Sequence, residues 1–326
     1  MNKLNQLRHI TSVFIKDTID YEELNEAIKT YKEILQSLNL IDLDTPENRT
    51  DVHATGGVAI APSWAALCVE DAIRTRQFVR GVHQAIEQVL AEKKDSSPVE
   101  ILYAGTGPFA TLVLCLLPQY TPQQIKLTLL EINDISFRAV ESVFEQLGFQ
   151  NFVRELSQEN AVTFQIQHSP DIIISETMLR ALDKEPQIAI MMNLLAQAKP
   201  DVIMIPQNIR LNLGVSRFNN ETLSPEYQNL SKLLETDATS LLAYRQASAF
   251  PSIRIKINLD KYRVYQDLGI HTDIQVFEDC HISFNQSGLT IPKKILDIGS
   301  TPEKEVGFEF QYQIEPLPEL TIKSLI

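Results

Sequence analysis

The chain has 326 residues, of which 44% are apolar and 22% charged, a composition typical of a globular protein of two domains. Its 29 Lys and Arg stand against 42 Asp and Glu, and the net charge of −13 argues against a nucleic-acid backbone or an anionic membrane as partner and favours cationic partners. Apolar runs such as Phe109–Leu117 are shorter than the roughly 18 residues that a membrane span needs, and Met1–Asn5 lacks the apolar part of a signal peptide. We therefore expect a cytoplasmic protein. The spacing of Cys68, Cys115 and Cys280 suits neither a zinc site nor a disulfide framework, so we expect core residues and no metal.

The N-terminal third has a helical pattern. Apolar residues at helical spacing follow Asp20 and predict an amphipathic helix to about Leu38. The stretch Asp42–Gly57 is polar, contains proline and glycine, and is predicted to form a loop or lid. A long helix is predicted over about Ser63–Glu92. We assign residues 1–97 to a helical segment with a lid.

After a polar break, short apolar strands alternate with helices, the pattern of βαβ units in a parallel sheet. One helix is predicted to end near Leu117, one to span Asp134–Leu147 with Gly148 ending it, and one to end near Lys199. The predicted strands are Val99–Ala104, Lys126–Ile132, Phe152–Glu155, Asp171–Ser175 and Asp201–Ile205. We assign residues 98–206 to a Rossmann-like domain.

Alternating strands follow and predict a half-solvated antiparallel β domain over residues 207–326. The predicted strands are Arg210–Leu213, Ser252–Leu259, Ile274–Phe277, His281–Phe284 and Gly307–Ile314. The polar, helix-compatible segment 218–244 interrupts them and could form a projecting helical arm.

A glycine-containing turn follows the first predicted strand of the sheet. Its residues are Tyr103, Ala104, Gly105, Thr106 and Gly107. Glycines at such a turn let the backbone approach a ligand, and the next helix begins with free N–H groups. Glu131 ends the neighbouring strand, where a carboxylate can accept hydrogen bonds from both ribose hydroxyls. The pattern predicts a nucleoside site, although any strand–helix turn can need glycines and Glu131 could be a solvated strand end.

The kind of nucleoside follows from what the turn lacks. The position three residues after Gly107 is Ala110, so the dinucleotide fingerprint G-x-G-x-x-G is incomplete, and there is no G-x-x-x-x-G-K-[ST] for ATP or GTP. The turn resembles motif I of class I S-adenosylmethionine (SAM) methyltransferases, although Tyr103 stands where an Asp is common and Phe109 where a third glycine is usual. In that resemblance Glu131 is the acid that binds ribose.

Two further motifs flank this turn. The sequence Asp71–Thr75 (DAIRT) precedes it, and Ser175–Met178 (SETM) follows it, with Glu185 nine residues after Glu176. In this order the motifs resemble the protein arginine methyltransferases. The resemblance implies a Rossmann-like SAM domain with N-terminal helices and a C-terminal antiparallel, barrel-like β domain.

The resemblance also assigns roles. Arg74 would bind the SAM carboxylate, Glu159 or Asn160 the adenine, and Glu176 and Glu185 would clamp a guanidinium. The alternatives are that Arg74 pairs with Asp71 on its own helix, and that Glu185 is an acid favoured at a helix N-terminus.

His271 is the counterpart of the histidine in the family's Thr-His-Trp segment, although His281 could serve instead or neither could act. Two departures concern the acceptor: an aromatic pair expected before DAIRT is missing, Trp64 being the nearby aromatic, and Arg180 follows SETM where it could neutralise the clamp.

The resulting expectation is a cytoplasmic SAM-dependent methyltransferase that transfers a methyl group to a guanidinium or another nitrogen. Its substrate would be an arginine-containing protein or peptide, or a small amine. The alternatives are a small-molecule N- or O-methyltransferase and a SAM-binding protein without activity. By resemblance, we also expect a homodimer formed through the arm at residues 218–244.

Overall fold

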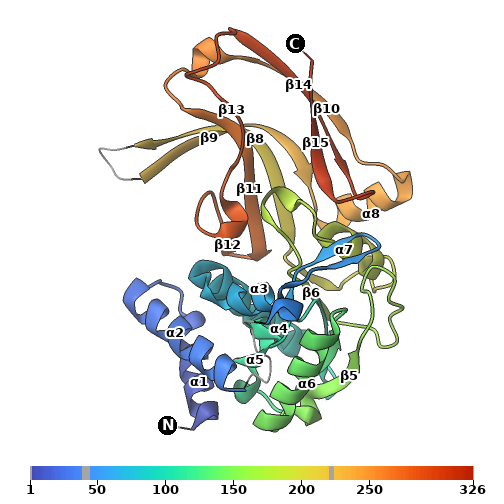
Figure 1. Ribbon diagram of the computed structural model, residues 1–326. Coiled ribbons are helices and arrows are strands. Elements are labelled where there is room, and N and C mark those ends of the chain that lie inside the picture. The colour runs from blue at the N-terminus through green and yellow to red at the C-terminus, as the bar shows by residue number, and fades with distance from the viewer. Residues whose placement is uncertain (1, 39–44, 220–223, 326) are drawn as a thin grey trace.

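The computed structural model describes residues 2–38, 45–219 and 224–325 and has two parts (Figure 1). The N-terminal part, coloured from blue to green, holds a parallel sheet among helices. The C-terminal part, coloured from yellow to red, is built mainly of antiparallel strands. The predicted fold class, a Rossmann-like sheet with N-terminal helices and a C-terminal β domain, is confirmed. No described helix has both the length and the apolar character needed to cross a bilayer.

Two helices begin the chain, α1 (Lys3–Phe14) and α2 (Tyr21–Leu38). The side chain of Asp20 accepts hydrogen bonds from the Glu22 and Glu23 amides at 3.0 and 3.1 Å and so caps α2, as its position predicted. The helix buries its apolar stripe, and the rings of Phe14 and Tyr31 meet edge to face.

The next segment differs from the prediction. Within the predicted loop the structure has the 3₁₀ turn η1 (Pro46–Arg49) and an antiparallel hairpin of β1 (Val52–Ala54) and β2 (Gly57–Ala59); residues 42–44 lie outside the described part. The single predicted helix over Ser63–Glu92 is also wrong. It is three elements, α3 (Pro62–Leu67), η2 (Cys68–Glu70) and α4 (Ala72–Glu92), because Asp71 adopts an extended conformation and caps α4.

The five predicted strands form one parallel sheet in the order β5-β4-β3-β6-β7. They span β3 (Val99–Ala104), β4 (Ile125–Leu130), β5 (Val153–Ser157), β6 (Ile172–Ser175) and β7 (Ile203–Ile205). The first two connections lead outward from β3 to β4 and β5, and the next returns to its other side at β6. This reversal opens a crevice at the carboxyl end of β3, where ligands bind in such sheets.

The connecting helices are α5 (Thr111–Leu114), α6 (Asp134–Leu147) and α7 (Gln187–Leu195), with 3₁₀ turns η3 (Leu117–Gln119), η4 (Gln150–Phe152) and η5 (Arg180–Leu182). The α6 prediction, including Gly148 at its end, is confirmed. The helix after β3 is shorter than predicted, and α7 ends before Lys199.

Two antiparallel sheets make up the C-terminal part. One has the order β12-β11-β8-β9, with β13 also pairing with β11, and the other has the order β10-β14-β15. The predicted barrel-like closure is therefore wrong for the described residues, since these are two open sheets. The strands are β8 (Asn208–Asn219), β9 (Ser224–Glu235), β10 (Ser252–Asn258), β11 (Asp267–Phe277), β12 (Cys280–Ile282), β13 (Lys293–Asp297), β14 (Glu305–Gln313) and β15 (Glu319–Ser324).

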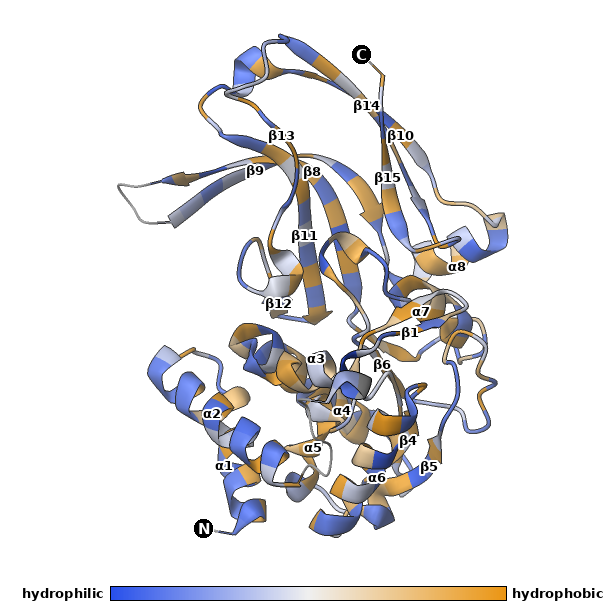
Figure 2. Ribbon diagram, in the orientation of Figure 1, coloured by the Kyte–Doolittle hydropathy of each residue, from blue (hydrophilic) through white to orange (hydrophobic). Residues whose placement is uncertain are grey.

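Hydrophobic and hydrophilic residues alternate along β8 and β11 (Figure 2), the pattern that predicted this part to be antiparallel. Helix α8 (Ala238–Ala247) and the 3₁₀ turns η6 (Leu259–Tyr262) and η7 (Gly288–Thr290) complete it.

Segment 218–244 is not a helical arm. It contains the end of β8, all of β9 and most of α8, while residues 220–223 lie outside the described part. Strands β8 and β9 pair from Arg210 to Asn219, and the ion pair of Arg217 with Glu226 joins them near the end of the hairpin. Pairing with β8 overrides the helix-compatible sequence. The hairpin projects from the body of the protein (Figure 1).

Candidate functional site

A cavity of about 460 Å³ lies at the carboxyl ends of β3, β4 and β6. Its other walls come from the β1–β2 hairpin, α3 and η7, so both parts of the chain contribute. This volume is in the range of pockets that bind small organic ligands. The predicted site residues that line it are Arg74, Tyr103, Gly105, Thr106, Gly107, Glu131, Glu159, Asn160, Glu176 and Glu185.

The glycine turn forms one wall of the cavity, but its amides are used within the protein. The amides of Gly105 and Thr106 donate to the Leu130 carbonyl at 2.9 and 3.2 Å, and that of Gly107 donates to Glu131 at 2.8 Å. Gly105 has a φ of +73°, and a Cβ there would lie 2.3 Å from the methyl group of Thr177. Glycine is therefore required by the conformation and by a close protein contact.

Glu131 is held by two backbone amides. Its Oε2 accepts from Gly107 and its Oε1 from Asn133, each at 2.8 Å. Burial raises the pKa of the carboxyl, and the backbone amides of Asn133, Gly107 and Ile132 oppose that rise. Because a carboxylate has about four acceptor positions, it keeps capacity to accept a hydrogen bond from a ligand. Glu131 is a fixed, buried acceptor rather than a solvated strand end.

The strand before the turn is buried. Tyr103 lines the cavity, and burial raises its pKa. Ala104 is completely buried in β3 and is not part of the cavity wall.

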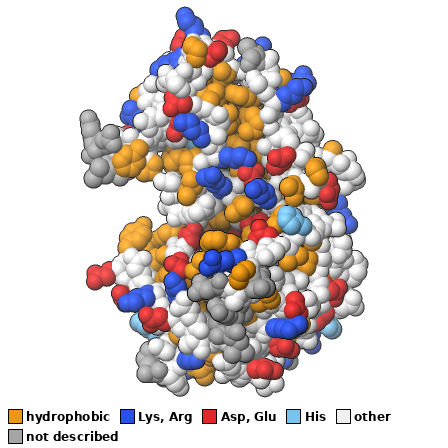
Figure 3. Space-filling model, in the orientation of Figure 1, with side chains coloured by type: hydrophobic (Ala, Val, Ile, Leu, Met, Phe, Trp, Pro, Cys, Tyr) orange, Lys and Arg blue, Asp and Glu red, His pale blue; other side chains and the backbone are white. Residues whose placement is uncertain are grey.

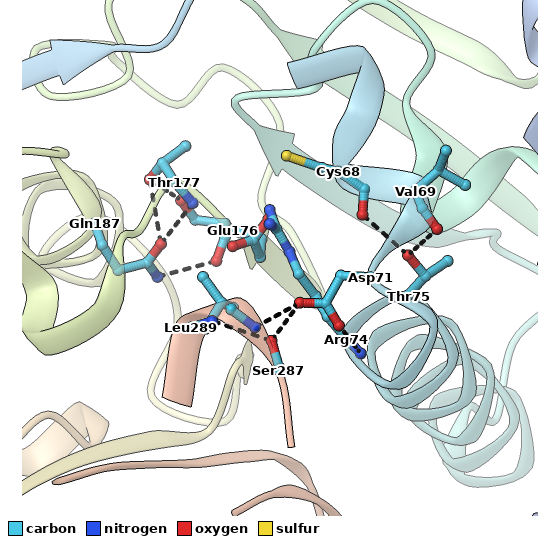
Figure 4. A network of polar contacts seen from close by, with 12 residues as sticks. Cys68, Val69, Asp71, Arg74, Thr75, Glu176, Thr177, Gln187, Ser287 and Leu289 are labelled. Carbon is cyan, nitrogen blue, oxygen red and sulfur yellow. Dashed lines mark hydrogen bonds and ion pairs between the residues drawn. The ribbon is translucent and has the colours of Figure 1, made fainter. Parts of the chain in front are cut away.

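Arg74 reaches across the site from the first turn of α4. Its guanidinium forms a largely buried ion pair with Glu176, which directly follows β6 (Figure 4). Asp71 instead accepts from the Arg74 backbone amide at 3.1 Å. The other oxygen of Asp71 accepts from the Ser287 hydroxyl and the Gly288 amide at 2.6 and 2.8 Å, which joins α4 to the C-terminal part. The alternative that Arg74 pairs with Asp71 is therefore not what the structure has.

The segment between the two candidate clamp residues is tightly held. Ala181, Leu182 and Lys184 all have positive φ, between +57° and +66°. Such strain in residues with side chains persists where the surroundings hold it. The surrounding hydrogen bonds come from the C-terminal part: Ala181 N donates to Thr272 Oγ1 at 3.1 Å, Tyr312 Oη to Leu182 O at 2.8 Å and Lys184 N to Pro318 O at 2.6 Å.

Glu185 is buried, with 6% of its surface exposed. Burial raises its pKa to about 7, nearby Arg74 opposes this rise and Asp51 adds to it. The β1–β2 hairpin packs on the backbone directly before it: Val58 N donates to Lys184 O at 2.9 Å, and a Cβ on Gly57 would lie 2.7 Å from that oxygen. Glu185 also directly precedes Pro186, the N-cap of α7, so the predicted position of Glu185 at the start of a helix is confirmed.

Glu159 and Asn160 lie at another side of the cavity. The amide of Asn160 donates to Thr55 O at 3.2 Å and accepts from Val162 N at 2.9 Å, so both of its ends have protein partners. Glu159 accepts from the Ser157 hydroxyl at 2.5 Å through one oxygen.

The structure does not bring His271 to the cavity. The side chain lies 2% exposed in β11, its Nδ1 is 2.9 Å from Asn229 Oδ1, and its ring meets those of Tyr227 and Phe284. Burial lowers its pKa to about 4. His281 and Arg180 are also absent from the cavity wall, so Arg180 does not neutralise the clamp from within it.

Sequence reasoning missed several residues of the wall. Trp64 and Cys68 come from the segment read as one continuous helix, and Leu289 from a turn without a motif. The expectation that all three cysteines are core residues holds for Cys115 and Cys280, which are buried, whereas Cys68 is half-buried. No group of three His, Cys, Asp or Glu side chains placed to hold a metal ion occurs in the described part of the chain.

Comparison with known proteins finds likeness in structure. No protein-family model matches the chain, and no curated protein does. Protein arginine methyltransferase 10 of Arabidopsis thaliana, in an open conformation, matches with a TM-score of 0.50 and 12% identity over 79% of this chain and 95% of that chain. The Trypanosoma brucei PRMT1 enzyme–prozyme heterotetramer with AdoHcy matches with the same values. The chain shares the fold of these enzymes.

Proposed function

We propose that this protein is a SAM-dependent methyltransferase that acts on a guanidinium group. The observation that carries the proposal is that one cavity combines the buried acceptor Glu131 beside the glycine turn, the cation Arg74, and the two acids Glu176 and Glu185, of which Glu185 is buried and Glu176 half-buried. The shared fold and the AdoHcy bound by the T. brucei relative support this cofactor.

The cofactor side of the cavity fits a nucleoside with an amino-acid tail. Glu131 is proposed to accept from the ribose hydroxyls through its remaining acceptor positions, and Glu159 or Asn160 to bind the adenine. Arg74 is proposed to bind the tail carboxylate, for which a guanidinium is the best-suited side chain. When bound, SAM supplies an electrophilic methyl group on a positively charged sulfur.

The acceptor side is proposed to be formed by Glu176 and Glu185. The Oε1 atom of Glu176 is buried and has no hydrogen-bond partner among the described residues, which leaves it as an acceptor for the N–H group of a substrate. Two carboxylates can orient a guanidinium and draw its positive charge away from the reacting nitrogen. Because its pKa is near 7, Glu185 is also suited to take the proton that the methyl group replaces.

The three segments of the chain are proposed to have different roles. We propose that residues 98–206 bind the cofactor, residues 1–97 cover it with the β1–β2 hairpin and α3, and residues 207–326 hold the segment between the two acids. The hydrogen bonds that Ala181 N donates to Thr272 and that Tyr312 donates to Leu182 O support the last role.

We also propose a cytoplasmic homodimer. Three free cysteines suit a reducing compartment. Phe218 and Tyr227, on the projecting hairpin, are 52% and 45% exposed. Figure 3 shows hydrophobic side chains on both sides of the notch beneath this hairpin, which supports its use as a contact between protomers.

The test has two stages. Calorimetry with SAM and S-adenosylhomocysteine should show binding, and labelled SAM should then transfer its methyl group to arginine-containing peptides or free arginine. Replacing Glu185→Gln should abolish most of that transfer while SAM still binds. Transfer to another amine or to a hydroxyl group, with normal turnover in the Glu185→Gln variant, would show that the guanidinium assignment is wrong.

A further inference from the structure

The side chain of Gln187 is buried at the start of α7, with 2% of its surface exposed. Its Nε2 donates to the Ser175 carbonyl at 2.9 Å. Its Oε1 accepts from the Thr177 amide at 2.9 Å and from the Thr177 hydroxyl at 3.1 Å. Figure 4 shows this amide facing the end of β6, next to Glu176.

These hydrogen bonds fix the residues on both sides of Glu176. Ser175 precedes it and Thr177 follows it, so the backbone that carries the carboxylate is held at two points. Gln187 itself comes two residues after Glu185. A single buried amide therefore connects the two segments that carry the candidate clamp.

The residue type at this position is informative. Helix α7 (QIAIMMNLL) is mostly apolar, and its neighbours Ile188 and Ala189 are buried hydrophobic residues. A methionine of similar volume could fill the same space in the core. A buried amide is tolerated because all of its hydrogen bonds go to Ser175 and Thr177, so its specific contribution is the position of that backbone.

We infer that Gln187 is a positioning residue that sets the separation of Glu176 and Glu185, an inference that rests on the proposed function. The intervening segment contains the strained residues Ala181, Leu182 and Lys184, so it has conformations of lower strain available if its ends are released. Gln187 prevents the segment from adopting these conformations by holding the end that carries Glu176. The role does not require contact with a substrate.

The test compares Gln187→Met with a matched control, Asn208→Leu. Asn208 is another buried amide, at the start of β8, that bonds Glu235 Oε1 at 2.9 Å and Thr236 N at 3.2 Å away from the cavity. Both variants should lose similar stability. Gln187→Met should also lower kcat/KM for an arginine peptide about tenfold or more, because misplacement of a binding group slows transfer strongly. Its affinity for SAM should stay close to that of the wild type.

A milder variant covers the case in which Gln187→Met fails to fold. Thr177→Val keeps the backbone hydrogen bond from Thr177 to Gln187 and removes the contacts of the Thr177 hydroxyl with Gln187 and with the Ser175 hydroxyl, so it should show a smaller fall in the same direction. Acceptor kinetics equal to those of Asn208→Leu in both variants would overturn the inference.

A crystal structure separates this inference from the proposed function. In Gln187→Met, or in Thr177→Val if the former does not fold, the distance between the carboxyl carbons of Glu176 and Glu185 should differ from that of the wild type. An unchanged distance would refute the positioning role. If the wild type binds SAM but methylates no arginine compound, the proposed function fails, while this structural comparison still decides the role of Gln187.

Discussion

The guanidinium of Arg74 donates to the carboxylate of Glu176, so a cofactor-binding candidate and an acceptor-binding candidate neutralise each other in the cavity. Both side chains are largely buried, 14% and 5% exposed. If SAM binds through Arg74, its carboxylate competes with Glu176 for the same cation. Cofactor binding is therefore expected to leave Glu176 freer to accept a second guanidinium.

Replacing Arg74→Met should weaken SAM binding by about tenfold to a hundredfold, the range of a charge-assisted hydrogen bond. Titration calorimetry measures this directly. The matched control is Arg154→Met, which breaks the ion pair with Glu100 at the amino end of the sheet, opposite the cavity. Equal SAM affinities in the two variants would contradict the role of Arg74.

Replacing Glu131→Gln should both destabilise the turn and weaken SAM binding. A glutamine has a single acceptor oxygen, so the amide of Gly107 or that of Asn133 loses its partner at a cost of about 1–3 kcal/mol. Chemical denaturation and calorimetry measure the two effects. Glu141→Gln, an exposed residue of α6, is the control and should change neither quantity. Normal SAM binding by Glu131→Gln would argue against ribose recognition by this acid.

Glu185 predicts how stability depends on pH. Its pKa is raised from 4.5 to about 7 by burial, so the folded protein holds this proton more tightly than the unfolded chain does. The contribution of Glu185 to the free energy of unfolding is full below about pH 4.5. It is lost as the pH rises through about 7, an effect on the order of 3 kcal/mol. Unfolding free energies of the wild type, measured between these values, should fall with pH more steeply than those of Glu185→Gln. Parallel curves would contradict the buried, protonated acid.

The same acid predicts the pH dependence of transfer. A guanidinium is bound by ionised Glu185, so kcat/KM for the acceptor should rise as the pH increases through about 7. This rise should be absent in Glu185→Gln. A wild-type profile that is flat across this range would exclude the titration of Glu185 as the controlling step.

His271 is expected to stabilise the β domain rather than to act in transfer. Its pKa is lowered to about 4 from 6.5, so its contribution to stability is present above pH 6.5 and is lost as the pH falls through about 4. His271→Phe should remove that dependence and keep kcat within about twofold, because the side chain lies outside the cavity wall. A loss of transfer without a change in SAM binding or stability would show that His271 acts in methyl transfer.

The exposed side chains of the β8–β9 hairpin predict that it joins two protomers in a homodimer. Phe218→Glu, at a side chain that is 52% exposed, should convert a homodimer to a monomer, as measured by analytical ultracentrifugation. Ile322→Glu, on β15 and 37% exposed, is the control and should leave the state unchanged. A dimer that persists in Phe218→Glu would place the contact elsewhere.

Local sequence was sufficient where the physical cause is local. The apolar stripe of α2, the β-branched runs of the parallel sheet and the stop of α6 at Gly148 all follow from periodicity and backbone preference, and all were predicted correctly. The prediction of a helical arm over residues 218–244 was wrong because the conformation of this segment depends on pairing with β8, a partner that its own composition does not reveal.

The sequence by itself determined the order of the motifs and hence the parallel sheet with a polar site at the carboxyl ends of its strands. Tertiary structure decided which side chains meet there: Arg74 contacts Glu176 across 102 residues of chain, Ser287 bonds Asp71, and Gln187 holds the residues beside Glu176. Such contacts depend on how strands and loops distant in the chain pack together. Residue spacing along one segment carries no information about that packing, which is why the cavity had to be read from the folded chain.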